Sequence, residues 1–307
     1  LKVLMSLSVI KQMDLWVIPM LWILGATSSM SPQINSHWAT DESRHKSLYP
    51  ADLRPQAHEI IRTWAFYTIA KSYLHEDQIP WHNIAISGWV VNPDKTKMSK
   101  SKGNSVTPED LIEKYGADAL RYWSARARLG VDTIFDESVF KVGLRLVTKL
   151  VNVSKFVVMQ FEQAGLKLSD VKDINLTDID KSWLAGFSEL LISSKKDFAN
   201  FKYSEVLHNT EHKFWDFCDN YVELVKTRSY QQHDQDIGKS ALFALYTSLS
   251  ILIRLFAPFM PFVTEQVSGW LDLSSNIANK KYNQIDNQKD KSVHLMPWPD
   301  NSDFGLK

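Results

Sequence analysis

The spacing of apolar residues changes once along this chain of 307 residues, near residue 107, and this change constrains the fold more than any other feature. Between about residues 25 and 103, short apolar runs alternate with polar segments that are rich in turn-forming residues. Beyond about residue 136, apolar residues recur with the spacing of amphipathic helices. The sequence therefore predicts a partial α/β region followed by a larger, mainly α-helical region.

Two segments of the first region indicate regular structure. Residues 84–91 predict a buried strand, because the run is short, rich in β-branched residues and bounded by Asn83 and Asn92. Residues 57–73 place apolar side chains at helical positions and predict a helix ahead of that strand. Strands that alternate with helices are typical of an α/β sheet.

Local signals mark where the next helices begin and end. Thr107 followed by Pro108 predicts a helix start, since a hydroxyl can cap the first turn and proline fits the first helical position. Gly116 is expected to end this helix. A second helix is expected over residues 117–129, with Gly130 at its end.

Only long helices are expected beyond about residue 136. Residues 241–257 predict an apolar helix, which Pro258 would halt because proline cannot continue a helix. The polar stretch 274–292 predicts a surface loop. The sequence contains no internal repeat and no heptad run long enough for a coiled coil.

Charge and cysteine content exclude several classes of protein. The 35 basic and 35 acidic residues give a formal net charge of zero, which argues against a uniformly basic surface but allows local basic patches. Cys218 is the one cysteine, so the sequence has neither an internal disulfide nor a cysteine-based zinc site. This usage fits a cytoplasmic location, where thiols stay reduced.

The first 24 residues are apolar, but they are not expected to enter a membrane. Lys11 and Asp14 interrupt the apolar run, and Pro19 breaks what remains of it. A spanning helix needs about 20 apolar residues, and no signal-peptide cleavage pattern follows.

Residues 94–104 read Asp-Lys-Thr-Lys-Met-Ser-Lys-Ser-Lys-Gly-Asn and directly follow the predicted strand. Ligands of open α/β sheets bind beyond the carboxyl ends of strands, and lysine ammonium groups suit phosphate oxygens. A lysine-rich loop without further context is more often a solvated basic loop. The order of the residues decides between these two interpretations.

Lys97-Met98-Ser99-Lys100-Ser101 matches the KMSKS signature of class I aminoacyl-tRNA synthetases. The resemblance implies that an amino-acid carboxylate attacks the α-phosphorus of ATP, giving an aminoacyl-adenylate and pyrophosphate. It implies Lys97 and Lys100 as catalytic residues, which stabilise the growing negative charge of the pyrophosphate together with Mg²⁺. Ser99 and Ser101 are implied to bind ATP in the same loop.

Residues 49–67 form the second informative stretch. His58 and Glu59 begin a pattern that resembles the zinc-protease motif, but Arg62 stands where that motif requires its second histidine. By their chemistry alone, the polar and aromatic residues here are more often structural than functional.

The same stretch closely resembles the strand-to-helix segment of valyl-tRNA synthetases that precedes KMSKS. That resemblance implies that Gln56 and His58 bind the adenylate and that Trp64 lies against the valine side chain. Glu59 stands where the family usually has aspartate, and its extra methylene is expected to shift a ribose contact.

The valyl resemblance runs from about residue 26 to about residue 299. It implies the C-terminal half of a Rossmann-like catalytic domain over residues 26–135 and an α-helical anticodon-binding domain over residues 136–307, after an atypical segment 1–25. The implied partners are tRNA(Val) and valine, with ATP and Mg²⁺. Four basic residues could touch tRNA phosphates or lie on solvated helix faces: Lys141, Arg145, Lys226 and Arg228.

The HIGH motif of the class, which supplies the other side of the ATP site, does not occur in this sequence, and the inserted editing domain is also missing. We therefore expect this chain alone to be unable to activate valine. A separately encoded N-terminal half is one possible partner. The alternatives are a catalytically inactive tRNA-binding fragment and a fragment of an isoleucyl- or leucyl-tRNA synthetase.

The first 25 residues do not follow the valyl pattern. One permitted coding of residues 16–25, read in another frame, contains the Asp-Thr-Trp that valyl enzymes carry just before the segment at residues 26–29. We hypothesise that these residues are translated out of frame, which the nucleotide sequence would test.

Overall fold

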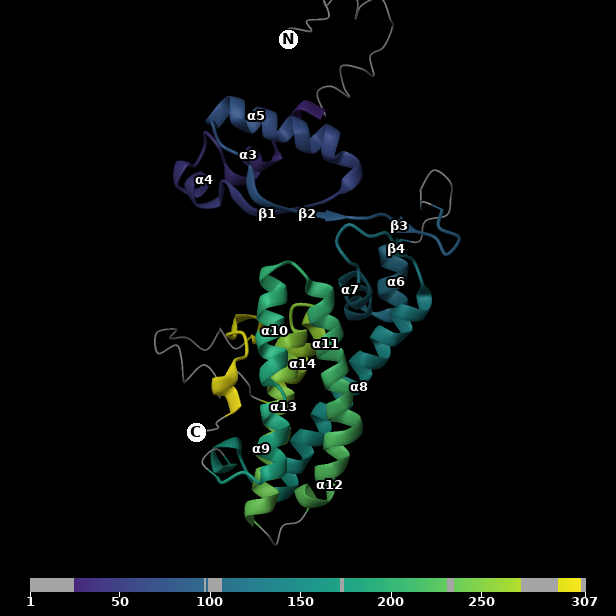
Figure 1. The fold of residues 1–307 in the computed structure, drawn as a ribbon, viewed down its shortest axis with the longest axis vertical. Coiled ribbons are helices and arrows are strands. Elements are labelled where there is room, and N and C mark those ends of the chain that lie inside the picture. Colours follow the sequence, from purple (N-terminus) through teal and green to yellow (C-terminus); the bar gives the residue numbers. More distant parts are fainter. Residues whose placement is uncertain are drawn as a thin grey trace, which may run out of the picture. The chain divides into compact units, whose positions relative to one another are not determined.

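The computed structural model describes residues 25–96, 98, 107–171, 174–230, 235–271 and 292–304. The chain divides into two compact units (Figure 1). The first consists of Leu1–Trp89 with Leu129–Asp132, and the second of Val90–Arg128 with Thr133–Lys307.

The first unit contains a pair of parallel strands, β1 (Ala51–Ala57) and β2 (Trp81–Ser87), in which Ala51 lies opposite Trp81 and Ala57 opposite Ser87. Helix α5 (Phe66–Glu76) lies in the connection between them, as parallel strands require. Two short helices, α3 (Ser31–Ser36) and α4 (Glu42–Leu48), precede β1 (Figure 1). The predicted α/β region is confirmed.

The predicted helix over residues 57–73 begins too early. Ala57 is still paired with Ser87 in the sheet, so the chain cannot be helical there. A 3-10 turn (His58–Ile60) and a π-helical turn (Ile61–Ala65) follow, and the regular α-helix starts only at Phe66. It continues to Glu76 and ends at Asp77 in the left-handed conformation.

The predicted strand over residues 84–91 is interrupted at Gly88. A Cβ atom at this position would lie 2.3 Å from the carbonyl oxygen of Val131, so the crossing segment needs a glycine there. Beyond Gly88, the two-residue strand β3 (Val90–Val91) belongs to the second unit, where it pairs in parallel with β4 (Thr133–Ile134).

Two short helices follow β3 in the second unit. In α6 (Pro108–Tyr115), the hydroxyl of Thr107 accepts a hydrogen bond from the Asp110 N–H at 3.4 Å, and Gly116 ends the helix with φ of 82°, which confirms both predicted signals. Helix α7 (Ala117–Ala125) ends four residues before the predicted position 129. Leu129 forms a bridge with Ser87 instead, and this pairing draws the chain out of the helix.

The rest of the second unit is a helical bundle (Figure 1). Helix α13 (Gln235–Phe256) is long and apolar enough to cross a membrane, but 94% of its most apolar window is buried, so it is the core helix of the bundle. It ends before Pro258, as predicted. The loop predicted over 274–292 lies, apart from Ser292, outside the described residues. The other helices are α8 (Glu137–Ala164), α9 (Asp178–Ala185), α10 (Ser188–Ala199), α11 (Tyr203–Asp216), α12 (Val222–Tyr230) and α14 (Pro261–Trp270).

Candidate active site

Gln56 and His58 lie at the carboxyl end of β1. The Gln56 side chain is buried, and its Oε1 has no hydrogen-bond partner among the described residues. The exposed His58 ring places Nδ1 3.3 Å from the carbonyl oxygen of Ser87, at the carboxyl end of β2. Because a carbonyl oxygen only accepts, Nδ1 carries the proton in this contact. Both predicted residues therefore stand at the edge of the sheet where α/β proteins bind ligands.

Trp89 is a neighbour of His58 that the sequence reasoning missed. The two ring centroids are 4.7 Å apart with an interplanar angle of 48°, and the Trp89 Nε1–H donates to the Glu59 carboxylate at 3.2 Å. The Trp89 side chain thus contacts the side chains of both His58 and Glu59. The sequence feature that could have indicated Trp89 is its position as an aromatic residue immediately after Gly88, at the end of a strand.

Trp64 occupies the π-helical turn that follows His58. Its Nε1–H donates to the Ser28 carbonyl oxygen at 2.8 Å, and its ring stacks on Trp81 at 5.7 Å between centroids. The Arg54 guanidinium carbon lies 4.0 Å from the centre of the Trp64 ring, and burial lowers the pKa of Arg54. Among the described residues, no hydrogen bond or ring contact joins Trp64 to His58.

A tight turn directly precedes the lysine-rich segment. The Asn92 N–H donates to Thr96 O at 2.9 Å, and the Lys95 N–H donates to Asn92 O at 2.8 Å. The hydroxyl and the backbone N–H of Thr96 both donate to Asp94, and these hydrogen bonds lower the pKa of the carboxyl. The predicted ATP-binding residues Lys97, Ser99, Lys100 and Ser101 follow this turn and lie outside the described residues.

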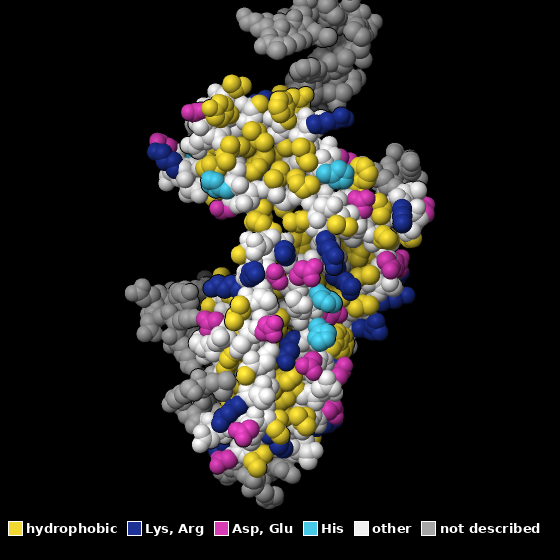
Figure 2. Space-filling model, in the orientation of Figure 1, with side chains coloured by type: hydrophobic (Ala, Val, Ile, Leu, Met, Phe, Trp, Pro, Cys, Tyr) yellow, Lys and Arg dark blue, Asp and Glu magenta, His cyan; other side chains and the backbone are white. Residues whose placement is uncertain are grey.

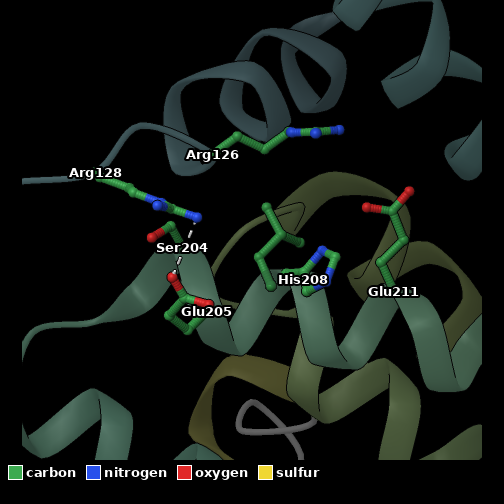
Figure 3. Close-up of a pocket in the computed structure, with 7 residues that line it drawn as sticks. Arg126, Arg128, Ser204, Glu205, His208 and Glu211 are labelled. Carbon is green, nitrogen blue, oxygen red and sulfur yellow. Dashed lines mark ion pairs between the residues drawn. The ribbon is translucent and has the colours of Figure 1, made fainter. Parts of the chain in front are cut away.

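A pocket of about 180 Å³ lies in the second unit, between the chain after α7 and the helix α11 (Figure 3). Arg128 faces Glu205 at 3.7 Å, and Arg126 donates to the Tyr122 hydroxyl at 2.9 Å. That hydroxyl in turn donates to Glu211 at 2.8 Å. Burial, followed by the Glu211 carboxylate, raises the pKa of Tyr122. Because arginines and carboxylates are balanced here, we assign the pocket a structural role in joining α7 to α11.

The four basic residues that were considered for phosphate contacts differ in their surroundings. Arg228 makes two hydrogen bonds to the buried carboxylate of Asp180, at 2.8 and 3.1 Å, so the interpretation as a solvated helix face is wrong for this residue, and its contact with phosphate stays a prediction. Lys226 pairs with Glu223 at 3.4 Å. Lys141 and Arg145 are exposed on α8. Figure 2 shows basic and acidic side chains interspersed over the visible face of the bundle.

No group of three or more His, Cys, Asp or Glu side chains suited to a metal ion occurs in the part of the chain that the structure describes. The buried thiol of Cys218 has its pKa raised to about 12 by burial, which keeps it protonated near neutral pH.

Two family models match this sequence. Residues 22–136 match tRNA synthetases class I (I, L, M and V), and residues 180–306 match the anticodon-binding domain of tRNA ligase. The first match includes α6 and α7, which pack with the bundle in the structure. The predicted boundary between residues 135 and 136 stays a prediction.

Curated relatives are valine–tRNA ligases. The chain is 45% identical over 268 residues to that of Rickettsia felis, covering 83% of this chain and 31% of the relative. It is 48% identical over 255 residues to that of Rickettsia rickettsii strain Sheila Smith, covering 79% and 31%. It is 42% identical over 275 residues to the valine–tRNA ligase of Salinispora arenicola, covering 89% of this chain and 30% of the relative. The chain therefore spans about a third of the length of these relatives.

Solved structures share the fold. A LeuRS from Agrobacterium radiobacter K84, in a ternary complex with tRNA and LeuAMS, superposes with a TM-score of 0.65 at 17% identity, covering 91% of this chain and 33% of that one. Mycobacterium tuberculosis methionyl-tRNA synthetase in complex with methionyl-adenylate superposes with a TM-score of 0.60 at 23% identity, covering 75% of this chain and 46% of that one. The family matches, the relatives and the fold agree: the chain belongs to the class I aminoacyl-tRNA synthetases and corresponds to a C-terminal part of valine–tRNA ligases.

Proposed function

We propose that this chain supplies the KMSKS half of the ATP site and the tRNA-binding domain of a valine–tRNA ligase. The complete enzyme would join valine and ATP to give valyl-adenylate and pyrophosphate, and would then transfer the valyl group to tRNA(Val). The observation that carries the proposal is the Lys-Met-Ser-Lys-Ser sequence at residues 97–101, shortly after β2, in a chain that is 45% identical to a valine–tRNA ligase.

Lys97 and Lys100 are proposed to bind the phosphates of ATP. Negative charge builds on the pyrophosphate as it leaves, so ammonium groups that meet it in the transition state lower the barrier. Neither lysine needs to transfer a proton. Ser99 and Ser101 are proposed to bind ATP in the same loop, which closes over the nucleotide and reopens for product release.

Gln56 and His58 are proposed to bind the adenylate. Their position at the carboxyl end of β1 supports this, as does the Gln56 Oε1, which has no hydrogen-bond partner among the described residues. Trp64 is proposed to lie against the valine side chain. Its ring is stacked on Trp81, contacted by the Arg54 guanidinium and held by the hydrogen bond to Ser28, so its position is fixed.

Mg²⁺ is proposed to arrive with ATP and to share the phosphate charge. The described residues provide no cluster of carboxylates or histidines that would hold this ion on the protein. We further propose a cytoplasmic location, in keeping with a single, buried cysteine.

ATP–pyrophosphate exchange tests the proposal. The purified chain is mixed with the part of the Rickettsia felis valine–tRNA ligase that precedes its region of similarity to this chain. We expect valine-dependent exchange from the mixture and none from either part alone. Exchange with isoleucine or leucine in place of valine would contradict the valine assignment.

Robust valine-dependent exchange by the chain alone would refute the expectation that it is only part of the site. Salt-dependent tRNA binding, without exchange in any mixture, would replace the proposal with an inactive tRNA-binding role.

A further inference from the structure

The backbone of Trp89 is held by the segment 129–132, which belongs to the same unit and lies beside the end of β2. The Trp89 N–H donates to the Asp132 carboxylate at 2.8 Å. The preceding residue, Gly88, has no room for a side chain, because a Cβ atom there would lie 2.3 Å from the Val131 carbonyl oxygen. These contacts fix the part of the backbone from which the indole projects.

The Trp89 side chain contacts two consecutive residues that follow β1. Its indole N–H donates to the Glu59 carboxylate at 3.2 Å, and its ring centroid lies 4.7 Å from that of His58. His58 and Glu59 are both exposed. An exposed glutamate loses rotamer freedom when its carboxylate binds a fixed donor. The indole therefore holds the Glu59 carboxylate in one place at the carboxyl end of β1.

A carboxylate held at this edge is suited to a ligand that carries hydroxyl groups. Its two oxygens have about four acceptor sites, so it can accept from an indole N–H and from a ligand hydroxyl at the same time. Ligands of open α/β sheets lie beyond the carboxyl ends of the strands, and an acidic side chain in such sites can bind a ribose hydroxyl. ATP, the proposed nucleotide of this site, carries two ribose hydroxyls.

We propose that Trp89 is a positioning residue of the ATP site and acts through Glu59. The indole N–H holds the carboxylate where it accepts hydrogen bonds from the ribose hydroxyls of ATP. This inference rests on the proposed function and adds a residue to which the family resemblance gave no role. Glu59 is one methylene longer than the aspartate expected at its position, and the bond to Trp89 determines where the longer side chain ends.

ATP–pyrophosphate exchange with two nucleotides tests the proposal. The chain is mixed with the preceding part of the Rickettsia felis valine–tRNA ligase to give the reassembled enzyme, which is supplied with ATP or with dideoxy-ATP, an analogue without ribose hydroxyls. Trp89→Phe keeps an aromatic ring beside His58 but removes the indole N–H. We expect the KM for ATP to rise about five- to tenfold and kcat to change less than about threefold, since the ribose contact is equal in the ground and transition states. The KM for dideoxy-ATP should not change.

Glu59→Asp tests whether Trp89 acts through the carboxylate. The variant shortens the side chain by one methylene and should separate its carboxylate from the indole. It should reduce the preference for ATP over dideoxy-ATP by the same factor as Trp89→Phe. The double variant should lose less than about twofold beyond either single variant, because residues that act as a unit are not additive.

Trp215→Phe is the matched control. The Trp215 Nε1–H also donates to a glutamate carboxylate, that of Glu211, at 3.4 Å, but this pair lies in the second unit. The variant should leave both KM values within about twofold, because distant sites act independently. A Trp89→Phe variant that raised the KM for both nucleotides equally, or for neither, would overturn the positioning role. Additive losses in the double variant would overturn the action through Glu59.

The indole N–H resonances of the nitrogen-labelled chain give a second measurement, which does not require activity. The Trp89 signal is identified by its absence in Trp89→Phe. It should move in Glu59→Asp and on addition of ATP, and it should move less with dideoxy-ATP at equal saturation. If no mixture shows exchange but ATP still moves this signal more than the analogue does, the proposed function alone fails. A signal that ATP leaves in place, or that both nucleotides move equally, would overturn the inference about Trp89.

Discussion

The Asp118 carboxylate accepts a hydrogen bond from the Val263 N–H at 2.7 Å, although the two residues stand 145 positions apart. Its other oxygen accepts from the Phe262 N–H at 3.2 Å, so a side chain of α7 caps the first turn of α14. Arg121, one turn later in α7, donates to the carbonyl oxygen of Pro258 at 2.8 Å and to that of Phe259 at 3.1 Å. Helix α7 therefore holds both the donor and the acceptor side of the turn between α13 and α14.

Asp118→Ala should lower the free energy of unfolding by about 1–2 kcal/mol, because loss of an N-cap leaves backbone N–H groups without a partner. Urea unfolding followed by circular dichroism measures this. Asp219→Asn is the control, because it removes an exposed ion pair with Lys149 at 3.3 Å and should cost less than about 1 kcal/mol. Equal losses in the two variants would contradict the capping role.

Asp180→Asn should destabilise the bundle by about 3–5 kcal/mol, because it leaves the Arg228 guanidinium without its charge partner. Burial acts to raise the pKa of Asp180, but hydrogen bonds from Arg228, Ser240, Tyr221 and Thr177 outweigh it and hold that pKa below its usual range. Urea midpoints near pH 7 measure the loss.

The lowered pKa of Asp180 also predicts how this loss depends on pH. A carboxyl whose pKa is lower in the folded chain contributes stability above its unfolded pKa of about 3.9 and loses it as the pH falls through the folded value. The difference in the free energy of unfolding between the wild type and Asp180→Asn should therefore become smaller below about pH 4. A difference that stays constant from pH 7 to pH 3 would contradict this assignment.

Cys218 should react only slowly with a thiol reagent while the chain is folded. The thiolate is the reactive form, and burial raises the pKa of this thiol to about 12. Ellman's reagent should therefore label the protein only slowly near neutral pH and rapidly in concentrated urea. Rapid labelling of the native chain would show that the π-helical turn Phe217–Tyr221, which contains Cys218, opens readily.

Gly88→Ala should displace the segment 129–132 from the end of β2. The new Cβ would lie 2.3 Å from Val131 O, so the hydrogen bond from Gly130 N to Ile86 O, now 2.8 Å long, should break. Hydrogen exchange at Gly130 should speed up. Gly269→Ala is the control, because nothing lies within 4 Å of its added Cβ, and it should be neutral or stabilise α14 by up to about 1 kcal/mol.

Lys100→Met should reduce the rate of valine-dependent exchange by the reassembled enzyme about 10²- to 10³-fold, with a smaller effect on the KM for valine. The loss is expected in kcat because the ammonium group meets its charge partner in the transition state. Lys95→Met is the control, since Lys95 lies in the exposed turn before the loop and should change the rate less than about threefold. A similar loss in both variants would indicate a general effect of positive charge.

Helix ends that depend on residues within one or two turns could be predicted from the sequence. Thr107 and Gly116 mark the ends of α6 because capping depends on neighbouring backbone groups. Pro258 lies beyond the end of α13 for a similarly local reason. Gln56 and His58 were placed at a strand end by resemblance to a family, and the structure puts them there.

Contacts between distant residues could not be predicted in this way. The break at Gly88 depends on Val131, and α7 ends early because Leu129 pairs with Ser87. The apolar spacing around Phe66 predicted a helix, but periodicity does not show whether an apolar face turns inward or outward. The sequence by itself thus determined the helices, their local ends and the family. Only the tertiary structure decided that α5 leaves Phe66 and Tyr73 each 60% exposed, because burial depends on which other segments pack against a helix.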